Sequence, residues 1–136
     1  MRRILAALGA AACLMGTPMI ASNAMAAAPN HFYYGSCAWW AANVRPDIGS
    51  KIFGNAAEWA GAAQAAGLPT GTTPQVNAIV VYQPGVQGAW GSGHVAHVIA
   101  VAPDGVHFTV DEMDYPVAGV VTQRASSTGP GVSFIY

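Results

Sequence analysis

Residues 93–115 read GHVAHVIAVAPDGVHFTVDEMDY, and this stretch decides the fold because the turn at its centre sets a register. The central APDGV at 102–106 is typical of a β-hairpin closed by a three-residue loop with a glycine bulge. Counting outward from it places His94 opposite Asp114, with Glu112 on the diagonal. Directly opposed residues share one sheet face, so the stretch predicts a hairpin that brings a histidine together with two acids.

The other face of this hairpin carries His97 opposite Asp111, which we interpret as a cross-strand pair. His94 and His97 are three residues apart on one strand, so their side chains point to opposite faces and are not expected to share a metal ion. No acid precedes Cys37 to bind calcium, and neither a D-x-D-x-D-G loop nor an H-E-x-x-H helix is present. We therefore expect no metal and no cofactor.

Two helices are predicted upstream of the hairpin. Cys37–Val44 is rich in alanine and tryptophan and lacks glycine and proline, which favours a short helix with the cysteine in its first turn. A second helix is predicted over residues 56–66. Asn55 is its N-cap, Glu58 completes a capping box, and Gly67 ends it.

The rest of the chain is predicted to form strands. β-Branched runs separated by turns predict strands over residues 76–83, 94–102, 106–113, 117–123 and 132–136, with a glycine-rich loop over 84–92. Helices followed by antiparallel strands indicate the α+β class, with the N-terminal helices packed on the sheet. The length of 136 residues fits one domain.

Residues 1–26 are predicted to be a secretory signal peptide. Arg2 and Arg3 precede an apolar run over 4–15, and the segment ends in an A-x-A-like site at Ala26. The apolar run is too short to span a membrane, and a lipid anchor on Cys13 is disfavoured by the apolar residues after it. We expect cleavage to leave a domain over 27–136 that is secreted, periplasmic or in the cell wall, without stable membrane association.

Composition excludes several classes of protein. Hydrophobic residues make up 53% of the chain and charged residues 8%, which excludes a disordered polyelectrolyte. Without the leader's two arginines, three of the five basic residues remain, Arg45, Lys51 and Arg124, against six acids, a net charge of −3. Three scattered cations make no basic face, so nucleic-acid binding is excluded. We expect Arg124 to be a surface charge.

Cys37 is the candidate nucleophile. Removal of the leader also removes Cys13, so Cys37 has no disulfide partner within the chain, and a free reactive thiol or an intermolecular bridge is expected. A thiolate at a helix N-terminus beside His94 is a strong nucleophile, and Glu112 or Asp114 would fix the histidine tautomer. The competing interpretation is a small buried cysteine and a structural histidine at a strand end.

The tryptophans are divided between the core and a ligand surface. Flat aromatic faces at Trp39, Trp40, Trp59 and Trp90 suit a sugar-binding groove, and the alternative is core packing. We predict that Trp59, on the inner face of the second helix, is core. Trp90 lies in the glycine-rich loop just before His94, where contact with a ligand is expected.

The sequence resembles the CHAP family, the cysteine- and histidine-dependent amidohydrolases and peptidases that cut peptidoglycan, within the papain-like, NlpC/P60-related superfamily. The resemblance covers nearly all of the chain after the leader and rests on five ordered motifs. They are Asn30 with Tyr34-Gly35-x-Cys37-x-Trp39, then Gly54-Asn55-Ala56-x-x-Trp59, Gly93-His94-Val95-Ala96, Glu112-Met113-x-Tyr115 and the closing Phe134-Ile135-Tyr136.

This resemblance implies a papain-like α+β fold and a mechanism. Cys37 attacks an amide carbonyl, its backbone N–H contributes to the oxyanion hole, and His94 acts as general base and then as general acid. Glu112 orients His94; it is chosen over Asp114 also because it shares strand parity with inward-facing apolar residues. The chain departs from the family pattern with Ser36 for glutamine, Ala38 for threonine, Trp40 for tyrosine and Asp114 for asparagine.

The resemblance implies a secreted peptidoglycan hydrolase, either an N-acetylmuramoyl-L-alanine amidase or a cross-bridge endopeptidase. Tyr34, Trp39, Trp90 and Asp114 are its candidate substrate-binding or supporting residues. The alternative is a catalytically silent binding or immunity-type module on the same scaffold. The enzyme is favoured because thiol, histidine and acid are all present. We expect a monomer whose partner is peptidoglycan.

Overall fold

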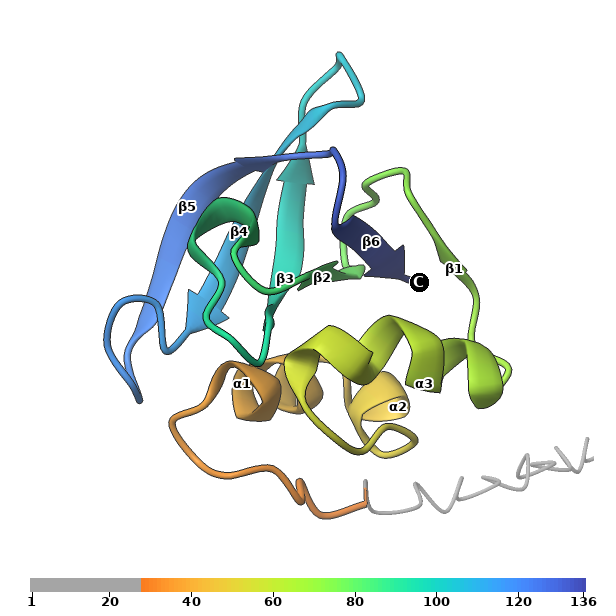
Figure 1. The fold of residues 1–136 in the computed structure, drawn as a ribbon, viewed down its shortest axis with the longest axis vertical. Helices are drawn as coiled ribbons and strands as arrows, with labels where there is room; N and C mark the ends of the chain where they lie inside the picture. The colour runs from red at the N-terminus through yellow and green to blue at the C-terminus, as the bar shows by residue number, and fades with distance from the viewer. Residues whose placement is uncertain (1–27) are drawn as a thin grey trace, which may run out of the picture.

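The computed structural model describes residues 28–136, so the predicted signal peptide lies outside the described residues. Helices near the N-terminus pack on a six-stranded antiparallel sheet, and the predicted α+β class is confirmed (Figure 1). Within the described residues, no helix is both long and apolar enough to cross a membrane.

The first helix, α1 (Cys37–Val44), has the predicted bounds. Ser36 is its N-cap, because its hydroxyl accepts the Trp39 N–H at 3.1 Å. A short helix that the sequence did not predict, α2 (Pro46–Gly49), follows directly. Gly49 approaches Ala42 of α1 so closely that a side chain at position 49 would collide with it, which fixes how α2 folds back on α1.

The second predicted helix is divided in two. It begins as a 3₁₀ turn, η1 (Ala56–Glu58), and continues as α3 (Trp59–Ala65). The backbone N–H of Asn55 donates to Glu58 Oε2 at 2.8 Å, as expected for a capping box. Trp59 is fully buried between this helix and the sheet, as predicted.

The sheet has the strand order β1-β6-β2-β3-β4-β5. Four of the predicted strands lie close to their expected positions, β1 was not predicted, and β5 starts later than expected. Residues 117–120 form a turn instead, with Gly119 at a φ of 74°. The glycine-rich loop contains a 3₁₀ turn, η2 (Val86–Gly88). The strands are β1 (Thr70–Gly71), β2 (Ile79–Tyr82), β3 (His94–Val101), β4 (His107–Met113), β5 (Val121–Ser127) and β6 (Val132–Ile135).

The register of the β3–β4 hairpin is correct at one end and wrong at the other. His97 pairs with Asp111, and Val98 with Val110, as predicted. A bulge between Val98 and Ala100 then shifts the pairing by one residue toward the turn. Ala102 therefore donates its N–H to the carbonyl of His107 at 2.8 Å, not to the predicted partner Val106. The sequence of the turn does not predict the bulge, because the extra unpaired residue is added to one strand only, away from the turn.

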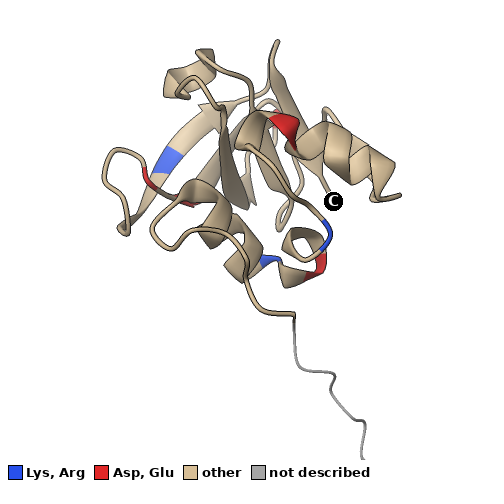
Figure 2. Cartoon of the chain, turned by 60° about the horizontal axis from the view of Figure 1, so that its bottom comes forward, with Lys and Arg blue, Asp and Glu red and all other residues tan. Residues whose placement is uncertain are grey.

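Both faces of the sheet are covered by apolar side chains. On the helix side, Val81, Val95 and Ile135 pack with Trp59 and the alanines of α1. On the other side, the sheet curves around a second cluster that includes Val80, Val110 and Phe134. All four residues of β2 are buried, as expected for a central strand. Charged residues are few, and some of the basic ones lie beside acidic ones on the fold (Figure 2).

Candidate active site

Cys37 and His94 come together where α1 meets the sheet. Cys37 is the first residue of α1 and is partly exposed, and His94 is the first residue of β3. α1 packs against β3 and β4, which brings the first residue of α1 toward the first residue of β3, and the interaction with Cys37 raises the pKa of His94. Both residues therefore lie at element ends, where they can reach each other without breaking the backbone hydrogen bonds of the sheet.

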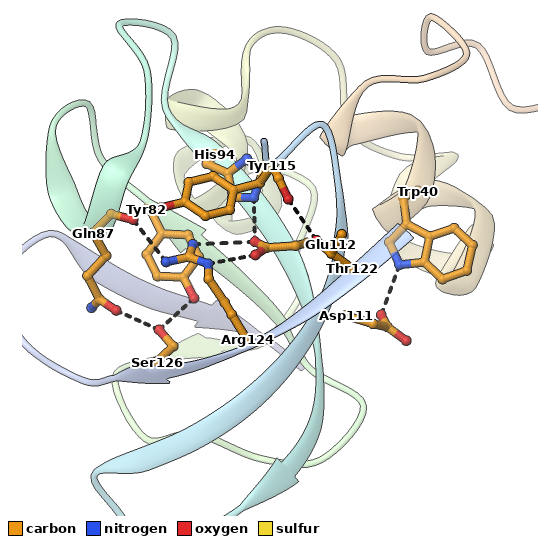
Figure 3. A network of polar contacts seen from close by, with 10 residues as sticks. All are labelled: Trp40, Tyr82, Gln87, His94, Asp111, Glu112, Tyr115, Thr122, Arg124 and Ser126. Atoms are coloured by element: carbon orange, nitrogen blue, oxygen red, sulfur yellow. Dashed lines mark hydrogen bonds and ion pairs between the residues drawn. The ribbon is translucent and has the colours of Figure 1, made fainter. Parts of the chain in front are cut away.

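Glu112 is the acid that contacts His94. Its Oε2 lies 2.7 Å from His94 Nε2, which leaves Nδ1 as the ring nitrogen available to the thiol (Figure 3). Both side chains are buried, with exposed fractions of 2% for His94 and 0% for Glu112. Asp114 lies beyond the end of β4 with a φ of 63°, and its half-exposed side chain makes no hydrogen bond among the described residues.

The environment favours a charged pair. Burial lowers the pKa of His94, but hydrogen bonds with Cys37 and Glu112 outweigh it and raise the pKa to about 9. Burial raises the pKa of Glu112, but its bonds with His94 and Arg124 outweigh burial and hold the pKa below its usual value. At neutral pH the site therefore holds an imidazolium and a carboxylate.

The expectation that Arg124 is a surface charge is wrong. Its Nε lies 2.6 Å from Glu112 Oε1, and its Nη2 lies 3.3 Å from Oε2 (Figure 3). Sequence reasoning missed this contact because the strand predicted over residues 117–123 ended before the arginine. One signal was available, because a buried Glu112 needs a cation and only three basic residues follow the leader.

A second polar cluster lies on the opposite face of the same strands. His97 Nδ1 is 3.0 Å from Asp111 Oδ1, as expected from the hairpin register, and Asn77 Oδ1 lies 3.0 Å from His97 Nε2. The indole N–H of Trp40 donates to the same Asp111 oxygen at 2.9 Å (Figure 3). This bond ties α1 to β4, so it fixes the helix that carries Cys37 against the strand that carries Glu112.

Two of the candidate substrate-binding aromatics are exposed and lie close to the site residues in sequence. Tyr34 is 64% exposed and lies three residues before Cys37, and Trp90 is 74% exposed and lies four residues before His94. Trp39 is half-buried, and its ring meets Tyr34 edge-on with centroids 4.7 Å apart. The described residues contain no group of three metal-binding side chains.

Residues 27–114 match the family model described as the CHAP domain. The chain belongs to the CHAP domain family. Over 119 residues it is 37% identical to staphylococcal secretory antigen SsaA of Staphylococcus aureus strain NCTC 8325, covering 85% of this chain and 43% of that protein. Over the same length it is 38% identical to SsaA of Staphylococcus epidermidis, with the same shares covered. The chain thus spans less than half the length of these relatives.

Two solved structures share the CHAP fold. The crystal structure of an N-acetylmuramoyl-L-alanine amidase from Staphylococcus aureus matches with a TM-score of 0.66 and 30% identity, over 75% of this chain and 30% of that one. Ly7917, solved with the hydrolyzing product of MDP, matches with a TM-score of 0.50 and 20% identity, over 74% of this chain and 53% of that one. At that identity, Ly7917 supports the fold alone.

The CHAP motifs converge on the site in space. The amide of Asn30 donates to the carbonyl of Trp39 at 2.8 Å, so the first motif braces the start of α1. The second motif supplies Ala57, whose N–H donates to the carbonyl of Ser92 at 2.9 Å, next to the Gly93 that precedes His94. Motifs distant in sequence therefore contact one another around the cysteine and the histidine.

The departure from the CHAP pattern at Ser36 has a structural consequence. Its hydroxyl donates to the carbonyl of Tyr33 at 2.7 Å and accepts the N–H of Trp39, so it is engaged in capping α1. Both of its interactions are with the backbone of its own segment. An oxyanion donor at this end of the site would therefore have to come from the N–H groups of the first helical turn, which lack intrahelical acceptors.

Proposed function

We propose that this CHAP domain is a secreted peptidoglycan hydrolase that cleaves an amide bond with Cys37 as nucleophile. The observation that carries the proposal is the position of Cys37 at the start of α1, packed against the strand that begins with His94, whose Nε2 lies 2.7 Å from Glu112 Oε2. An exposed nucleophile at a helix N-terminus, a base beside it and an acid that orients the base are the requirements of thiol-dependent acyl transfer.

The proposed reaction has two steps. The Cys37 sulfur attacks the amide carbonyl as a thiolate whose proton is held by His94, and the N–H groups at the start of α1 stabilise the oxyanion. His94, as imidazolium, gives its proton to the leaving amine as the C–N bond breaks, which leaves a thioester on Cys37. Neutral His94 then takes a proton from water, whose oxygen attacks the thioester. The carboxylic acid is released, and the site returns to the thiolate of Cys37 with a protonated His94.

Peptidoglycan is proposed as the substrate on two grounds. One is the similarity to a protein named as an N-acetylmuramoyl-L-alanine amidase, which also favours the stem amide over a cross-bridge as the bond that is cut. The other is the pair of exposed rings, Tyr34 and Trp90, close to the cysteine and the histidine in sequence, which suit the faces of sugar rings. Trp39 and Asp114 would support this surface.

Secretion is proposed from the predicted leader and from the relatives. The matched CHAP region begins at residue 27, directly after the predicted signal peptide, and the SsaA relatives are named secretory antigens. An exported enzyme would meet its wall substrate without further transport.

The first prediction concerns the thiol. Purified protein incubated with peptidoglycan should release fragments whose masses identify the bond, and stoichiometric alkylation of Cys37 by iodoacetamide should abolish release, because Cys37 is the one thiol after the predicted leader. Cys37→Ala should be equally inactive, and EDTA should leave the rate unchanged. Full activity of the alkylated protein, or loss with EDTA that calcium restores, would contradict the mechanism. Binding of peptidoglycan with no fragment released would indicate the silent module.

A further inference from the structure

Glu112 is held by more than its contact with His94. Its carboxylate has no exposure to solvent, and a buried carboxylate is costly unless both of its oxygens are bonded. His94 contacts Oε2 only. Arg124 Nε donates to Oε1 at 2.6 Å, and Arg124 Nη2 donates to Oε2 at 3.3 Å. Both carboxylate oxygens are therefore hydrogen-bonded.

The strand register accounts for this contact between Arg124 and Glu112. In the β4–β5 pair, Glu112 stands opposite Thr122 and Arg124 stands opposite Val110. Glu112 and Arg124 are therefore diagonal neighbours on one face of the sheet, a spacing that long side chains can bridge. A guanidinium reaching across this diagonal bonds Oε1, the carboxylate oxygen that His94 does not contact.

The guanidinium itself is fixed by further contacts. It lies over the ring of Tyr115, 4.2 Å from the centroid, and 5.1 Å from the centroid of Tyr82. Its Nη1 donates to the backbone carbonyl of Gln87 at 2.9 Å. Stacking and three hydrogen bonds leave Arg124 few alternative rotamers, so Glu112 is held by a rigid partner.

Gln87 extends this contact into the loop before His94. It is a non-glycine residue with a left-handed backbone, at φ 47°, which needs support from its surroundings. Its side-chain Oε1 accepts the Ser126 hydroxyl at 2.7 Å, and its Nε2 donates to the carbonyl of Ser127 at 2.8 Å. The loop that carries Trp90 is thereby attached to β5, the strand of Arg124.

We infer that Arg124 is a positioning residue of the active site, which aims the Glu112 carboxylate at His94 and attaches the loop of residues 83–93 to the same strand. The inference rests on the proposed function, because it assigns Arg124 a part in the reaction of Cys37. Arg124 touches neither the thiol nor a reacting atom, so it acts through Glu112.

A positioning role and a purely electrostatic one predict opposite changes at His94. If Arg124 acted only as a nearby positive charge, its removal would relieve repulsion and raise the pKa of His94. If it positions Glu112, its removal lets the carboxylate turn away or take up a proton, and the pKa of His94 falls from about 9. The other titratable groups facing this network are Cys37, Tyr82 and Tyr115, and none of them is altered by the substitution.

The test compares Arg124→Met and Arg124→Lys with a matched control, Arg45→Met. Arg45 has the same kind of contacts, through Nε and Nη2 to Asp47 and through Nη1 to a backbone carbonyl, but it lies at the α1–α2 junction. Urea unfolding establishes that each variant is folded. The readouts are the NMR titration of His94 and kcat and KM on peptidoglycan as a function of pH.

We expect Arg124→Met to lower kcat about 10- to 100-fold with KM nearly unchanged, because a misplaced general base loses rate on that scale. The His94 pKa should fall in the same variant. Arg124→Lys should recover part of kcat and part of the His94 pKa, because an ammonium restores the positive charge but not the two hydrogen bonds to the carboxylate. Arg45→Met should change neither quantity.

The inference is overturned if folded Arg124→Met keeps the wild-type kcat, if its His94 pKa is unchanged or higher, or if only KM changes. Failure of the proposed function is separately visible. An inactive wild type, or an active Cys37→Ala variant, would disprove cysteine catalysis, whereas the His94 titration would still report whether Arg124 positions Glu112.

Discussion

Glu112 is the acid that forms ion pairs with both His94 and Arg124. It lies on the buried side of β4, together with Phe108 and Val110, so its carboxylate is removed from water and depends on its partners for stabilisation. Asp114, two residues later, lies past the strand end. The two acids of the hairpin therefore have different environments, although both are near His94 in the predicted register.

The second prediction separates these acids. Glu112→Gln should lower kcat/KM by at least about 100-fold, because the neutral amide cannot stabilise an imidazolium and leaves Arg124 without its counter-ion. Asp114→Asn should stay within about 2-fold of wild type, because its side chain bonds no partner and asparagine tolerates the left-handed backbone. Activity is measured on peptidoglycan, with urea unfolding to show that both variants fold. The reverse ranking would make Asp114 the orienting acid.

Among the secondary-structure elements, the contact between η1 and the loop before β3 places His94. Gly93 has a φ of 78°, and a Cβ built there would lie 2.6 Å from the backbone nitrogen of Ala57. A main-chain atom cannot move aside as a flexible side chain can. Position 93 therefore requires glycine for two reasons, its left-handed backbone and the close approach of Ala57. The η1 turn, which contains Ala57, helps to set the start of the strand that begins with His94.

The third prediction uses two glycines of one loop. Gly93→Ala should destabilise the protein by on the order of 2 to 4 kcal/mol, from the left-handed backbone and the clash, and should lower activity by displacing His94. Gly91→Ala is the matched control, because no atom lies within 4 Å of its added Cβ and its φ is not in the left-handed region. Urea unfolding and peptidoglycan digestion measure both effects. Equal stabilities of the two variants would show that the close approach to Ala57 is not a constraint.

At the scale of the whole molecule, several of the few charged residues form ion pairs, and these pairs differ in burial. Two ion pairs include a side chain that is well exposed to solvent, Arg45 with Asp47 and His107 with Asp104. A separate group of three, Glu112 with His94 and Arg124, is centred on a carboxylate that has no exposure. Pairs near the surface are screened by solvent and contribute little to stability. The buried group should therefore dominate the dependence of stability on pH above neutrality.

The fourth prediction follows from the sign of the His94 shift. Its pKa is raised from 6.5 to about 9 on folding, so its contribution to stability is fully present below pH 6.5 and is lost as the pH rises through 9. The lowered pKa of Glu112 has the opposite effect, because its contribution is lost as the pH falls below about 4.5. The free energy of unfolding should therefore be highest between these limits.

Urea unfolding at pH 5.5, 7.5 and 9 measures this decline. The control is His94→Gln, in which the fall between pH 6.5 and 9 should be largely absent. The pKa of Tyr82 is raised by burial to about 12, so its titration lies above this window. A wild-type stability that is flat from pH 6 to 9 would mean that His94 does not carry a raised pKa in the folded protein.

The sequence alone determined the features that depend on neighbouring residues. Helix propensity and the absence of glycine and proline predict α1 with Cys37 at its start. The proline-aspartate-glycine turn, with side chains alternating between the two faces of the sheet, predicts the pairing of His97 with Asp111. That same periodicity marks Glu112 as buried. Five ordered motifs made the family recognisable, because a motif preserves the local geometry of a site.

Only the tertiary structure decided how these elements meet. The contact of Arg124 with Glu112 depends on the pairing of β5 with β4 across an irregular turn over 114–120, where the sequence wrongly predicts the start of a strand. The attachment of Gln87 to β5 and the packing of Gly93 on Ala57 join segments about 40 residues apart. Such contacts leave no periodic signal in the sequence, because they are set by the position of whole elements and not by the residues next to them.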